Sequence, residues 1–116
     1  LSKVTGAMVC VADRDEIIAA AGKNHKNYIG KALSKELENI MDKRKSALYS
    51  KKDDTLIPVV KDDKVDCEAQ AIAVIVHDGD SAGAVILCVY DEKADKSEIA
   101  EKLAGAAAEF LADQLG

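Results

Sequence analysis

The sequence has 116 residues, of which 48% are hydrophobic and 32% charged, so it is long enough for one globular domain and too apolar for a disordered chain. Only 3% of the residues are aromatic and there is no Trp, so the chain has very few of the stacking side chains on which single-strand nucleic-acid readers depend. The net charge of −5 is uneven: residues 53–116 carry five Lys or Arg against fifteen Asp or Glu, which predicts a poor surface for binding DNA.

The N-terminal part predicts a β-hairpin. Residues 8–12 form a short apolar run that reads as a buried strand, and residues 16–21 form a second strand that ends at Gly22. Between them lies a charged turn of three residues, 13–15, and two apolar runs around such a turn are typical of a hairpin. Residues 23–27 are polar and are expected to form a loop.

A helix is predicted to begin at Ser34, which suits the N-cap position, with Glu36 and Glu38 near the positive end of the helix dipole. The basic residues 43–45 suit its C-terminal end. The members of its expected apolar face recur at helical spacing and are Leu33, Leu37, Ile40, Met41 and Leu48.

The next segment predicts a charged loop over residues 50–55 and a short strand over residues 56–60. Pro58 has no N–H for a strand ladder, so this segment is expected to be an edge strand or irregular. A turn at Asp62 and Asp63 is followed by a long strand over residues 69–77. Residues 78–81 form a turn, and residues 84–90 are continuously apolar, which predicts a central strand covered on both faces.

The C-terminal part predicts a second helix that begins at Asp95, with Glu98 in the capping-box position. Its apolar stripe is wide and rich in Ala, so we expect one side to pack on the sheet and the other on a partner helix. The sequence therefore predicts a homodimer or higher homo-oligomer formed through terminal helices. The residues expected in that contact are Leu103, Ala107, Phe110 and Leu111.

No combination of side chains predicts a metal or catalytic site, and no cofactor is expected. His25 and His77 have no Cys or His at ligand spacing, so both are interpreted as surface residues. Four Asp residues flank the centres of predicted turns, where their carboxylates satisfy local N–H groups, and no catalytic role is expected of them: Asp13, Asp15, Asp78 and Asp80.

The three cysteines are odd in number and have no regular spacing, so they do not predict a secreted disulfide framework. Cys10 and Cys88 lie mid-strand and are interpreted as small buried hydrophobes. Cys67 stands between Asp66 and Glu68, whose charges disfavour the thiolate. Without a signal peptide or a membrane-length apolar run, a cytoplasmic protein is expected, and the start at Leu1 suggests a piece of a longer chain.

The elements predict an α+β domain over residues 1–116, a mostly antiparallel sheet of about five strands with helices packed on it. Their order resembles a GAF domain. Residues 9–15 (VCVADRD) and 27–31 (NYIGK) resemble the first strand and the entry to the central helix of the C-terminal domain family of stage V sporulation protein T. Residues 41–46 (MDKRKS), 83–85 (GAV) and the Ala-rich terminal stretch resemble that family too.

The resemblance implies a regulator of sporulation, an activator or repressor of transcription whose DNA is held by a separate N-terminal domain. It also implies that residues 1–5 are the tail of a helix linking the two domains. GAF domains commonly bind small molecules and dimerise through terminal helices. An unidentified small molecule is therefore expected between the sheet and residues 26–37, and the residues expected to line that site are Val9, Val11, Arg14, Asn27, Tyr28 and Leu33.

Three functional hypotheses remain open at this point. The first is a sensor whose ligand shifts the packing of the terminal helices. The second is a scaffold that only fixes the oligomeric state, which a core filled by Leu33, Leu37 and Ile57 would favour. The third is a cysteine-dependent reductase of free methionine sulfoxide, which needs accessible thiolates and is the least favoured because Cys10 and Cys88 are expected to be buried.

Overall fold

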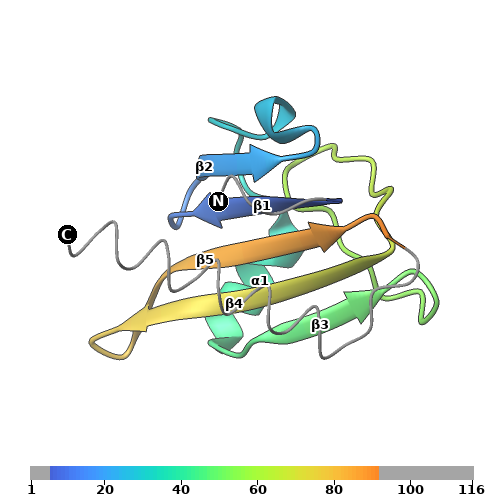
Figure 1. Ribbon diagram of the computed structural model, residues 1–116. Helices are drawn as coiled ribbons and strands as arrows, with labels where there is room; N and C mark the ends of the chain where they lie inside the picture. Colours follow the sequence, from blue (N-terminus) through green and yellow to red (C-terminus); the bar gives the residue numbers. More distant parts are fainter. Residues whose placement is uncertain (1–5, 92–116) are drawn as a thin grey trace.

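The computed structural model describes residues 6–91, which form a five-stranded antiparallel sheet with the order β2-β1-β5-β4-β3 (Figure 1). The strands are β1 (Ala7–Ala12), β2 (Ile17–Gly22), β3 (Ala47–Ser50), β4 (Ala69–His77) and β5 (Asp80–Val89). Between β2 and β3 lie a short 3₁₀ helix, η1 (His25–Asn27), and the helix α1 (Lys35–Lys43). The α+β class and the antiparallel sheet are therefore confirmed. The predicted second helix and residues 1–5 lie outside the described residues.

The strand predictions hold where local signals are strong. The hairpin β1–β2 and the strand β4 lie where the sequence predicts them. The second hairpin is tighter than expected: only Asp78 and Gly79 form its turn, both with positive φ, as a two-residue type I′ turn requires. As a result β5 begins at Asp80 and not at residue 84. Its position at the centre of the sheet agrees with its burial on both faces.

Helix α1 begins as predicted and ends earlier than predicted. Ser34 Oγ accepts a hydrogen bond from the backbone N–H of Leu37 at 3.0 Å. The helix ends where Arg44 adopts a left-handed conformation, with φ of 57°. Leu48 therefore does not belong to the helix, and that prediction is wrong: it lies in β3, paired with Ala71 of β4, and is 43% exposed. The pairing of residues 47–50 with β4 decides the structure of this segment, and the helical spacing of Leu48 from Met41 does not.

Residues 56–60 form no strand, so the irregular alternative is the one observed. The side chain of Gln70, on β4 and fully buried, bonds to the backbone of this segment as a neighbouring strand would. Its side-chain oxygen accepts from Ile57 N at 2.9 Å, and its side-chain nitrogen donates to Ile57 O at 2.7 Å. Ser34 Oγ also donates to Pro58 O at 2.6 Å. These bonds fix the loop that follows.

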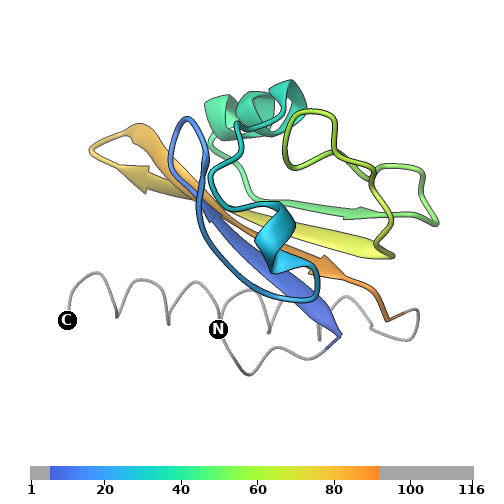
Figure 2. The same cartoon turned by 90° about the horizontal axis from the view of Figure 1, so that it is seen from above.

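Apolar side chains gather on both faces of the sheet. One group, here the helix-side cluster, lies beneath α1 and the loop over residues 51–68, which occupy the same side of the sheet (Figure 2). It contains Met8, Cys10, Ala12, Ile17, Tyr28, Leu33, Leu37, Ile40, Met41, Val59, Val60, Cys67, Ile72, Ala84, Ile86 and Cys88. The other group, the far-side cluster, contains Ala7, Val9, Val11, Ala71, Val85, Leu87 and Val89. No helix among the described residues is long and apolar enough to cross a membrane.

Candidate functional site

A hollow of about 310 Å³ lies between the segment of residues 24–31 and the loop of residues 60–66. Its lining is mostly polar and is formed by Asn24, Asn27, Tyr28, Lys31, Val60, Lys61, Asp62, Asp63, Lys64 and Asp66. A second hollow of about 390 Å³ shares residues 60–63 and extends toward Ser34, Lys35, Glu36 and Pro58. The loop that carries Asp63 therefore separates two neighbouring concave surfaces.

Asp63 joins the two walls of the first hollow. The Tyr28 hydroxyl donates to Asp63 Oδ1 at 2.9 Å, and Asp63 Oδ2 accepts from Val59 N at 3.1 Å. Burial raises the pKa of Tyr28, and the hydrogen bond to the Asp63 carboxylate raises it further. Tyr28 is therefore a neutral hydrogen-bond donor at physiological pH. Any molecule that competes for Asp63 would loosen the link between the two segments.

The charges that line this hollow balance. Three lysines, at positions 31, 61 and 64, stand against three aspartates, at positions 62, 63 and 66. Outside the lining of both hollows, Lys23 lies over the ring of Tyr90, 4.5 Å from its centroid. A site with both signs of charge suits a polar ligand with donor and acceptor groups. Among the described residues no cluster of three or more His, Cys, Asp or Glu is placed to hold a metal ion.

The structure does not bring together all six residues predicted to line one site. Asn27 and Tyr28 line the first hollow. Leu33 is fully buried in the helix-side cluster. Val9 and Val11 belong to the far-side cluster, so their placement beside Tyr28 is corrected. Successive strand residues point to opposite faces, and β1 turns Cys10 toward α1.

Sequence reasoning missed the loop side of the hollow. The sequence assigns Asp63 only to a turn and Asp66 only to the surroundings of Cys67, and it places neither Lys61 nor Lys64 in a site. The turn is real, since Asp62 has a positive φ and Asp63 N donates to Val60 O at 3.2 Å. A pair of aspartates in a turn indicates local hydrogen bonding and says nothing of the distant partner, Tyr28.

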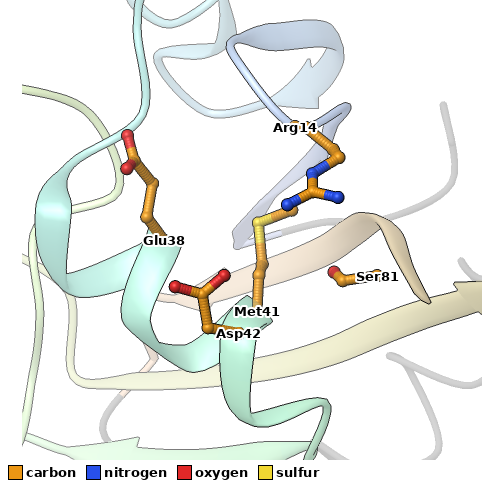
Figure 3. A pocket seen from close by; sticks show the side chains of 5 residues that line it. All are labelled: Arg14, Glu38, Met41, Asp42 and Ser81. Atoms are coloured by element: carbon orange, nitrogen blue, oxygen red, sulfur yellow. The ribbon is translucent and has the colours of Figure 1, made fainter. Parts of the chain in front are cut away.

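Arg14, the sixth predicted residue, lines a different and smaller pocket (Figure 3). This pocket has a volume of about 60 Å³ and is formed by Arg14, Glu38, Met41, Asp42 and Ser81. Arg14 comes from the β1–β2 turn, the two carboxylates and Met41 come from α1, and Ser81 comes from β5.

All three thiols are buried in the helix-side cluster. Burial and the charge of Asp63 raise the pKa of Cys10 to about 12. The hydrogen bond between Cys67 and Cys88 raises the pKa of Cys88 and lowers that of Cys67. The prediction that Cys10 and Cys88 are buried is confirmed. The acidic residues beside Cys67 were predicted to disfavour its thiolate. The hydrogen bond from Cys88 has the larger effect, so the pKa of Cys67 is lowered.

The residues predicted for dimerisation, Leu103, Ala107, Phe110 and Leu111, lie outside the described residues.

Comparison with known proteins identifies relatives of this chain. A family described as stage V sporulation protein T C-terminal, transcription factor, matches residues 1–116. The chain is also 36% identical over 110 residues to stage V sporulation protein T of Bacillus subtilis (strain 168). The aligned part covers 95% of this chain and 60% of that relative, so the chain spans less than two thirds of the relative's length.

Proposed function

The chain belongs to the family of stage V sporulation protein T C-terminal domains, and from this premise we propose that it is the regulatory domain of a sporulation transcription regulator. In this proposal the domain is GAF-like, acts in the cytoplasm, activates or represses transcription, and leaves DNA contact to a separate domain outside these 116 residues. The acidic charge of residues 53–116 supports that division, because it repels phosphate.

The regulatory signal is a small polar molecule bound in the hollow between residues 24–31 and 60–66. The observation that carries this proposal is the Tyr28–Asp63 hydrogen bond, which ties the two walls together across the sequence. A ligand that bonds to Asp63 replaces this link and shifts the two segments. Binding regulates only if the ligand favours one arrangement of the domain over another.

A thermal-shift screen of polar metabolites against the 116-residue chain tests the sensor hypothesis. A metabolite that binds here raises the melting temperature of the unaltered chain and has a smaller effect on the Lys61→Gln variant. Lys52→Gln is a matched control, since Lys52 is exposed and does not line the hollow. If no metabolite raises the melting temperature, or if Lys61→Gln responds like the control, the sensor hypothesis is rejected.

A scaffold function without ligand is the second candidate, and one observation favours it. Leu33 and Leu37 are fully buried, and Ile57 packs against the same cluster, so apolar side chains fill the space beneath residues 26–37. In this case the domain fixes the oligomeric state through Leu103, Ala107, Phe110 and Leu111. Light scattering then shows a homodimer or higher oligomer that Leu111→Asp dissociates and Glu109→Gln leaves intact.

We propose no enzymatic activity for the domain. A thiol reductase needs an accessible thiolate, and Cys10 and Cys88 are both buried with raised pKa values. Alkylation of the native chain by iodoacetamide is therefore expected to be slow at Cys10 and Cys88, with Cys67 the first to react. Rapid modification of Cys10 or Cys88 in the folded chain would contradict this assignment.

A further inference from the structure

We propose that the small pocket formed by Arg14, Glu38, Met41, Asp42 and Ser81 binds a small zwitterionic α-amino acid. This site is separate from the hollow at Tyr28, and the two share no lining residue within the described range 6–91.

The first observation is the buried hydroxyl of Ser81. The residue is 5% exposed, and its Oγ is buried without a hydrogen-bond partner among the described residues. A buried hydroxyl without a partner destabilises the fold and is uncommon in folded proteins, so its presence needs an explanation. In Figure 3 the Ser81 hydroxyl points into the pocket, toward Met41. A ligand oxygen at this place would complete its hydrogen bonding.

The backbone of β5 is shaped to turn Ser81 toward α1. Ala84, Ile86 and Cys88 face the helix side of the sheet, so an odd-numbered residue such as Ser81 would face away from α1 in a regular strand. The pairing with β4 shifts by one residue between Ile75 and Val76, which are opposite Gly83 and Ser81. This β-bulge reverses the alternation, and bulges of this kind re-aim side chains at functional sites.

Arg14 is held on a rigid turn above the pocket. Asp13 Oδ1 accepts hydrogen bonds from the backbone N–H groups of Asp15 at 2.8 Å and Glu16 at 2.9 Å. The two bonds lower the pKa of Asp13, so the turn keeps this structure at neutral pH. Arg14 itself forms no ion pair within the described part of the chain. Its guanidinium is therefore available for a carboxylate, which it binds with two parallel N–H···O bonds.

The opposite wall carries the complementary charge. Glu38 and Asp42 are four residues apart on α1, so they lie on the same face of the helix. Neither pairs with a cation of residues 6–91. The pocket thus presents a cation and a hydroxyl on one side and two carboxylates on the other. An amino acid fits this pattern when its carboxylate faces Arg14 and Ser81 and its ammonium faces Glu38 and Asp42.

The volume limits the size of the ligand. The pocket has a volume of about 60 Å³, so only the smallest amino acids are expected to fit. These are glycine, with five non-hydrogen atoms, and alanine, with six. A ligand this small binds no tighter than about the micromolar range.

Titration of the ¹⁵N-labelled 116-residue chain with glycine, followed by NMR, tests the proposal. We expect saturable shifts at the amides of Arg14, Asp42 and Ser81. Loss of one bond to a charged ligand group weakens binding by about tenfold or more, so Arg14→Gln, Asp42→Asn and Ser81→Ala should each show this effect. Lys45→Gln is the control, because Lys45 is exposed, lies just beyond the same helix and does not line the pocket.

Ser81→Ala separates binding from stability. Since the hydroxyl has no hydrogen-bond partner within residues 6–91, we expect this variant to melt at or above the temperature of the unaltered chain while it loses glycine affinity. The proposal is overturned if no saturable shift appears at tens of millimolar glycine, if Ser81→Ala binds glycine normally, or if acetate or methylamine alone gives the same shifts. Saturable shifts at Tyr28 and Asp63 with none at Arg14, Asp42 and Ser81 would also overturn it, and they would support the proposed sensor site instead.

Discussion

Replacement of Gln70 by Leu tests how the loop beside the candidate site is held. Gln70 is 1% exposed, and its side chain makes two hydrogen bonds to the backbone of Ile57, at 2.9 and 2.7 Å. Leu has a similar volume and makes neither bond, so the N–H and the carbonyl of Ile57 lose their partners in a partly buried place. Each unpaired group costs about 1–3 kcal/mol, and the apolar Leu recovers part of this by burial.

The expected net loss is about 3 kcal/mol in the free energy of unfolding, which corresponds to a fall of roughly 10 °C in melting temperature for a domain of this size. Urea denaturation measures the free energy, and native-state hydrogen exchange shows where it is lost. The amide of Ile57 should lose protection, whereas Leu87 in the central strand should lose protection only through global unfolding. A fall in melting temperature below about 3 °C, or unchanged protection at Ile57, would refute this reasoning.

Three further predictions concern the site and the core. Tyr28→Phe removes the hydrogen bond to Asp63, so the domain should lose about 1 kcal/mol by urea denaturation and exchange faster over residues 60–66; equal exchange in both proteins would contradict the link. The domain should lose stability as the pH rises from 9.0 to about 12, because the unfolded Cys10 thiol ionises in this interval while the folded thiol stays protonated. Over this interval the ionisation of Cys10 lowers the free energy of unfolding by about 1.4 kcal/mol per pH unit. If the urea midpoint of Cys10→Ala falls as steeply with pH as that of the unaltered chain, Cys10 is not the cause. Gly83→Ala places a methyl group against the backbone oxygen of Ala12, so a loss of about 2 kcal/mol is expected, and an unchanged urea midpoint would contradict this close strand contact.

Sequence patterns alone determined the elements whose signals are local. The strand over residues 69–77 and the start of α1 at Ser34 could be read from the sequence because alternation, capping and turn chemistry act over a few residues. The same holds for the burial of Cys10 and Cys88 within apolar runs. Family membership was also readable, since the matching segments extend over most of the chain.

Tertiary structure decided the elements that depend on distant partners. Leu48 stands at helical spacing from Met41, and only the pairing of β3 with β4 shows that it belongs to a strand. Residues 56–60 resemble a strand in composition, and only the side chain of Gln70 explains why they are irregular. In both cases the deciding contact joins residues that are at least 13 positions apart, beyond the reach of a local pattern.

The sites show the same division more sharply. The sequence singled out Arg14, Asn27 and Tyr28, but assigned all three to one pocket with Val9 and Val11. The sheet separates the two valines from the others, because alternate residues of a strand point to opposite faces. Whether a side chain such as Asp63 or Ser81 meets a distant partner depends on loop paths and on a one-residue bulge, and only the folded chain determines these.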